Sequence, residues 1–80
     1  MLTLAELNAR RAEILAVEHE IPPCGAAYFM VGLRLHVESH DWRDDSTDWH
    51  LYLSGLTSLT REGAEVKAAG LRELIEELQK

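Results

Sequence analysis

The sequence predicts a small α+β domain, with an antiparallel β-hairpin between two helices in the order helix–strand–strand–helix (αββα), packed in two layers. Three patterns predict it. Residues 3–20 have the composition and apolar spacing of a helix, residues 27–38 and 48–54 alternate apolar with polar side chains, and the last part of the chain is again helical. At 80 residues the chain has the size of one domain, which we take as residues 1–80.

The first helix is expected over residues 3–20. Thr3 and Glu6 have the T-x-x-E spacing of a capping box, in which each side chain satisfies a free backbone N–H at the start of a helix. The segment contains no Gly or Pro, and its alanines are strong helix formers. Pro22 and Pro23 end the helix, because the residue before a proline avoids the helical conformation.

A first strand is expected within residues 27–38, where every second side chain from Val31 to Val37 is apolar. Residues 39–47 are rich in Asp and Ser and predict a long hairpin loop. Residues 48–54 alternate again and predict a second strand, antiparallel to the first. An isolated hairpin is not stable, so we expect both helices to cover its apolar face.

The last helix is expected to begin at a cap formed by Ser58 or Thr60 and to continue to the end of the chain. Its apolar side chains follow helical spacing: Leu71, Leu74, Ile75 and Leu78. Gly63 and Gly70 lie seven residues apart within it. Two interpretations stay open: the glycines let the helix lie close to the sheet, or they kink or shorten it.

The charge balance favours a protein partner with a basic surface. Asp and Glu outnumber Lys and Arg by 14 to 8, and the formal net charge is −6. We therefore expect no direct binding to nucleic acid, since phosphate contacts need a basic patch. Complementary charge would steer a basic partner, although the same charge also serves solubility alone. A chain this small has a thin core, so homodimerisation is a further expectation.

The cysteine content and hydropathy predict a cytoplasmic protein. Cys24 is the only cysteine, which excludes an intrachain disulfide and fits a reducing compartment. We expect it to be a small buried apolar side chain rather than a reactive thiol. The N-terminus lacks the basic and apolar regions of a signal peptide, and no segment has the roughly 18 apolar residues of a membrane span.

Three histidines are candidate metal ligands. His36 and His40 are four residues apart, and His50 lies on the predicted second strand. On strands, only two of them would face each other, whereas a zinc site needs three or four ligands. We therefore expect solvated histidines and no metal or other cofactor, and keep a zinc-binding module only as an alternative.

The predicted loop carries the candidate partner-binding site. The run D-W-R-D-D-S-T-D lacks the glycine and the terminal glutamate of a calcium loop, so we interpret it as an acidic contact surface. Tryptophan is frequent at binding hot spots, and Trp42 either projects from the loop or folds back onto the core. The candidate contact residues are Asp41, Trp42, Asp44, Asp45, Asp48 and Tyr52.

Short stretches and the overall layout resemble known families. Residues 59–63, L-T-R-E-G, resemble the L-T-x-x-G step from wing strand into final helix in winged-helix regulators. The helix–hairpin–helix order is similar to small phage head–tail joining proteins, which implies a structural oligomer. Short acidic single domains also look like phage-encoded inhibitors such as anti-CRISPR proteins. No catalytic motif is present, so the leading hypothesis is a non-enzymatic interaction protein that blocks a basic surface of a host complex.

Overall fold

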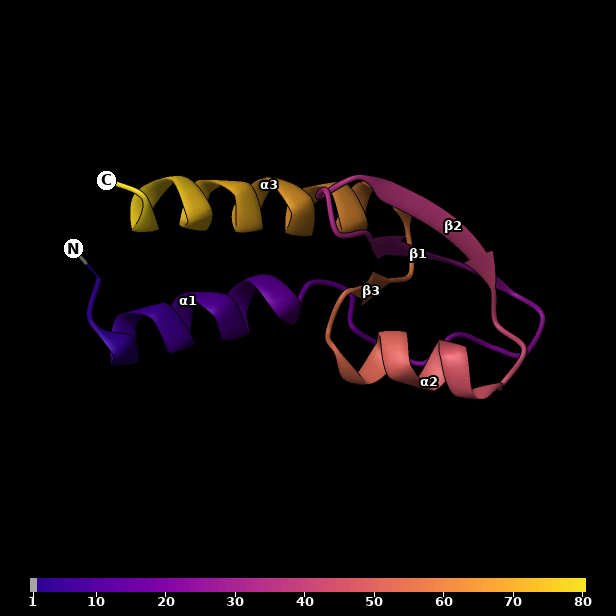
Figure 1. The fold of residues 1–80 in the computed structure, drawn as a ribbon. Helices are drawn as coiled ribbons and strands as arrows, with labels where there is room; N and C mark the ends of the chain where they lie inside the picture. Colours follow the sequence, from indigo (N-terminus) through magenta and orange to yellow (C-terminus); the bar gives the residue numbers. More distant parts are fainter. Residues whose placement is uncertain (1) are drawn as a thin grey trace.

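A three-stranded antiparallel sheet, in the order β2-β1-β3, joins the helices of the molecule (Figure 1). The computed structural model describes residues 2–80. Its elements in chain order are α1 (Leu4–Leu15), β1 (Ala27–Val31), β2 (Val37–Asp41), α2 (Ser46–Leu53), β3 (Thr57–Ser58) and α3 (Arg61–Leu78). The α+β class and the antiparallel hairpin between two helices are thus confirmed, while α2 and β3 were not expected.

The hairpin consists of different strands from those predicted. β1 and β2 pair from Ala27 opposite Asp41 to Val31 opposite Val37. Between them the chain turns: the Gly32 N–H donates to the His36 carbonyl at 2.8 Å, and Leu35 has a φ of 60°. The continuous strand predicted over residues 27–38 was therefore wrong beyond Val31. Beyond Val31 the alternating apolar side chains include Leu33 and Leu35, which belong to the turn, and Leu33 is fully exposed (103%).

The predicted second strand, residues 48–54, is instead helix α2. Asp45 caps this helix, and its carboxylate accepts a hydrogen bond from the Asp48 N–H at 2.9 Å. This bond satisfies a backbone donor that the helix leaves free, which favours the helix over a strand. Trp49 and Tyr52 lie about one turn apart on its inner face, where they approach Trp42. The loop expected at 39–47 is correspondingly shorter, because residues 39–41 belong to β2.

Helix α3 begins as predicted after the cap residue Thr60, whose hydroxyl accepts from the Gly63 N–H at 3.0 Å. Its first turns pack on the sheet, with Ala64 and Ala68 against Val31 in the core. The two α3 glycines do not face the sheet. A Cβ on Gly70 would lie 3.0 Å from Ile14 of α1, and one on Gly63 would meet the Glu18 side chain, so the glycines permit close approach of the N-terminal segment.

Helix α1 has the predicted capping box, because the Thr3 hydroxyl accepts from the Glu6 N–H and the Glu6 carboxylate accepts from the Thr3 N–H. It ends at Leu15, earlier than residue 20, and Glu18 then adopts a φ of 50°. No residue of α1 is buried. Cys24, in the following segment, is exposed, so its predicted burial was wrong.

The molecule is elongated, with principal extents of 43 × 20 × 17 Å. In Figure 1, α1 and the C-terminal half of α3 run antiparallel at one end, while the sheet and α2 occupy the other. We call the pair formed by α1 and residues 71–78 of α3 the helical arm. No helix among residues 2–80 is both long and apolar enough to cross a membrane.

Candidate functional site

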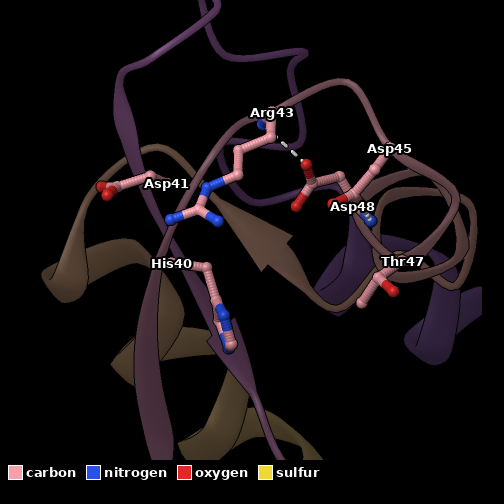
Figure 2. Close-up of a pocket in the computed structure, with 6 residues that line it drawn as sticks. All are labelled: His40, Asp41, Arg43, Asp45, Thr47 and Asp48. Atoms are coloured by element: carbon pink, nitrogen blue, oxygen red, sulfur yellow. Dashed lines mark hydrogen bonds between the residues drawn. The ribbon is translucent and has the colours of Figure 1, made fainter.

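Acidic side chains gather where strand β2 passes into helix α2. We call Asp41, Arg43, Asp44, Asp45 and Asp48 the acidic corner. All of them except Asp44 line an open hollow of about 280 Å³, together with His40 and Thr47 (Figure 2). Four carboxylates against one guanidinium give the corner a charge of −3, half of the net charge of the chain.

Asp48 forms the buried base of the corner, with a residue exposure of 5%. Its two carboxylate oxygens accept hydrogen bonds from the Tyr28 hydroxyl at 2.6 Å and from the Arg43 N–H at 2.7 Å. The Tyr28 hydrogen bond is the main cause that lowers the pKa of Asp48, and the backbone bond adds to it. Burial and the same hydrogen bond raise the pKa of Tyr28. Asp48 is therefore a fixed anion that ties β1, the loop and α2 together.

Asp44 and Asp45 hold the loop in shape while they remain exposed. Asp44 adopts a φ of 57°, a conformation that Asp tolerates better than most residues, and its carboxylate accepts from the Trp49 indole N–H at 2.6 Å. Asp45 is the α2 cap described above. Asp41, at the end of β2, is exposed, and its side chain makes no hydrogen bond or ion pair within residues 2–80. The corner thus presents three solvent-facing carboxylates on a fixed backbone.

An aromatic cluster supports the corner from behind. Trp42 is 3% exposed, so of the two alternatives for this side chain the structure selects the buried one. Its ring lies edge-on to those of Tyr28, Trp49 and Tyr52, with centroids 5.1–6.4 Å apart. Such edge-to-face contacts are favourable beyond the buried area alone. The consequence is that Trp42 positions the corner and is not itself presented to a partner.

Tyr52 lies apart from the hollow. It is half-buried on α2, stacks on His19 with centroids 4.3 Å apart, and its backbone carbonyl lies 2.6 Å from His19 Nε2. The six predicted contact residues therefore fall into three groups. Asp41, Asp44 and Asp45 are exposed at the corner, Asp48 lies beneath them, and Trp42 and Tyr52 belong to the aromatic cluster.

Arg43 and His40 complete the corner and were not expected there. Figure 2 shows the Arg43 side chain extending over the hollow between Asp41 and His40. The His40 ring stacks on Tyr28 at a centroid distance of 5.9 Å. The sequence contained a signal for Arg43, since it lies inside the run D-W-R-D-D, but spacing alone did not show which way it would point.

The histidines do not converge. His36 Nε2 lies 3.0 Å from a Glu38 carboxylate oxygen near the hairpin turn, whereas His50 is exposed on α2. Among residues 2–80 no group of three or more His, Cys, Asp or Glu side chains could hold a metal ion. The alternative of a zinc-binding module therefore has no ligand set in this part of the chain.

Lys67 of α3 lies outside the corner and is fully buried. Its ammonium donates to the Gly55 carbonyl at 2.8 Å and to the Thr57 carbonyl, both near the short strand β3. Burial lowers the pKa of Lys67 to about 8, against a smaller opposing effect of Glu18. Because its ammonium has no access to solvent, we interpret Lys67 as a structural tie between α3 and β3.

Comparison of the chain with protein-family models, curated proteins and solved structures finds no match.

Proposed function

We propose that this chain is a non-enzymatic protein-binding module that acts in the cytoplasm and covers a basic surface of a larger complex through the acidic corner. The observation that carries the proposal is the set of three exposed carboxylates at the corner. Asp41 and Asp45 line the hollow, Asp44 lies next to Asp45 in the chain, and Asp48 and the aromatic cluster fix their backbone. Carboxylates accept guanidinium and ammonium donors in strong, charge-assisted hydrogen bonds.

The size of the hollow supports a side-chain ligand rather than a substrate. At about 280 Å³ and open to solvent, it falls below the roughly 300–1,000 Å³ of typical small-molecule sites. A single arginine or lysine side chain of a partner would bind at the rim of the hollow, where the exposed carboxylates of Asp41 and Asp45 can accept its hydrogen bonds. The remaining acidic charge of the chain would steer such a partner toward the corner. An inhibitor of the phage type, which occupies the basic surface of a host complex, is the form of this function that we propose.

Neutralising the corner without changing its shape tests the proposal. In the variant Asp41→Asn/Asp44→Asn/Asp45→Asn, each amide oxygen can still accept the hydrogen bonds of Trp49 and of the α2 cap. The matched control Glu13→Gln/Glu20→Gln/Glu65→Gln removes the same charge from exposed positions elsewhere. At about 0.5 kcal/mol per exposed ion pair, the corner variant should bind its partner roughly tenfold more weakly.

The assay is capture from a native cell lysate at two salt concentrations, followed by mass spectrometry. We expect proteins with basic surfaces that are retained by the wild type and the control, lost with the corner variant, and released by high salt. Equal retention by the corner variant and the control would contradict the proposed function.

A further inference from the structure

The apolar face of α3 continues past the end of the sheet. Ala64 and Ala68 pack on Val31, and Leu71 packs at the edge of the same core. Ile75 and Leu78 follow at the same helical spacing, but they are 43% and 48% exposed. The stripe that makes the core thus extends along the helical arm, where no strand covers it.

Helix α1 adds to the same face of the arm. Leu15 contacts the Gly55 position on the sheet side, and Leu4, about three helical turns earlier, therefore points in the same direction. Leu4 is 73% exposed, and α1 as a whole buries no residue. α1 is held by its contacts with α3, which include an ion pair of 2.5 Å between Arg10 and Glu77. Two helices that share so little core are only marginally stable without further packing.

We infer that a second copy of this chain packs on the helical arm, antiparallel, so that the two arms form a four-helix bundle. Leu4, Leu71, Ile75 and Leu78 of each copy would form the apolar centre of this bundle. The long axis of 43 Å then places the two acidic corners at opposite ends of the dimer, far from the contact. The inference goes beyond the proposed function and does not depend on it.

The charges that border the stripe identify the second copy as its occupant. Gly70 faces Ile14 of α1, so by helix geometry Arg72 and Glu76 lie on the opposite side of α3, next to Ile75. Arg72 has no ion pair within residues 2–80. An antiparallel two-fold pairing about Leu74 sets Arg72 opposite Glu76 of the second copy, twice by symmetry. The surface is therefore complementary to itself in charge as well as in apolar character.

Sedimentation equilibrium of three proteins tests the apolar contact. The wild type should have twice the 9.0 kDa of one chain, Ile75→Glu should be a monomer, and Val66→Glu should remain a dimer. Val66 is the matched control, because it is 53% exposed on the same helix but about half a turn away from Ile75. A wild type that stays at 9.0 kDa up to about 1 mM overturns the inference. Equal dissociation by both substitutions, or by neither, also overturns it.

A charge swap tests the register independently of the apolar substitutions. Arg72→Glu and Glu76→Arg should each raise the dissociation constant about fivefold, because like charges then face each other across the two-fold axis. The double variant Arg72→Glu/Glu76→Arg restores both pairs and should return the dissociation constant to near the wild-type value. Thermal melts by circular dichroism show whether each chain is folded. A double variant as weak as the single ones overturns the proposed pairing.

Discussion

Replacing Asp48 by Asn tests the base of the acidic corner with the smallest change of shape. Asp48 accepts from the Tyr28 hydroxyl at 2.6 Å and from the Arg43 N–H at 2.7 Å. An amide offers one oxygen and one NH₂ group. If the oxygen stays on the Arg43 N–H, the NH₂ group can donate to the Tyr28 oxygen, but the Tyr28 O–H then loses its acceptor. Because Asp48 is buried, water cannot replace the lost acceptor.

The expected cost follows from that geometry. A hydrogen bond to a charged group contributes about 1.5–3 kcal/mol, and a buried donor left without an acceptor costs a similar amount. Asp48→Asn should therefore lower the free energy of unfolding by about 2–3 kcal/mol. The control Asp41→Asn makes the same chemical change at an exposed position without hydrogen bonds and should stay within about 0.5 kcal/mol.

Urea unfolding monitored by tryptophan fluorescence measures both variants. With a slope of about 1 kcal/mol/M for a chain of this size, the midpoint of Asp48→Asn should fall by about 2–3 M. The pKa of Asp48 is lowered in the folded state, so its contribution is present above the ordinary Asp pKa and is lost as the pH falls through the folded pKa. The decrease in the free energy of unfolding on acidification should therefore be smaller in Asp48→Asn than in the wild type. If Asp48→Asn is no more destabilising than Asp41→Asn, the buried carboxylate and its role in the corner are refuted.

Two further substitutions examine the interior. Lys67 has a folded pKa of about 8 against 10.5 when unfolded, so the unfolded chain binds more protons between these values and the free energy of unfolding should rise with pH there. Lys67→Met should abolish this rise in urea titrations between pH 8 and 10, and an unchanged rise would show that Lys67 is not its source. Trp42→Ala removes the centre of the aromatic cluster and should cost about 3–5 kcal/mol, seen as loss of near-UV circular dichroism. A near-UV spectrum of wild-type intensity would contradict the burial of Trp42.

The helix boundaries that were predicted correctly have local causes. The Thr3–Glu6 capping box and the Thr60 cap involve hydrogen bonds between residues three apart, so the sequence contains all the information needed. The end of α1 was predicted too late, because no Gly or Pro marks the turn after Leu15. Glu18 adopts a positive φ there without a sequence signal.

The hairpin was misplaced because a turn can imitate a strand. Leu33 and Leu35 keep the alternation of β1, yet the chain reverses between Gly32 and His36. Because the first strand was predicted to continue to residue 38, the second strand was expected at residues 48–54. That segment is too short to distinguish the period of a strand from the period of a helix. The D-x-x-D spacing of Asp45 and Asp48 could have indicated the α2 cap, but it was interpreted only as surface charge.

The composition of the acidic corner was only partly predictable for the same reason. Net charge and the acidic run identified Asp41, Asp44 and Asp45 as candidates, and these are exposed. The burial of Asp48 and Trp42 depends on Tyr28, which lies 20 residues from Asp48 in the chain. Contacts between such distant residues follow from the tertiary fold and have no periodic signal in the sequence.

The most direct test of the acidic corner is a two-dimensional ¹H–¹⁵N NMR titration with a short oligoarginine peptide. The Trp49 indole N–H, which donates to Asp44, is a reporter at the corner itself. We expect salt-sensitive shifts of this signal and of the Arg43 and Asp45 amides, and their loss in the Asp41→Asn/Asp44→Asn/Asp45→Asn variant. Shifts that map to another surface, or that persist in that variant, would show that the acidic corner does not bind basic side chains.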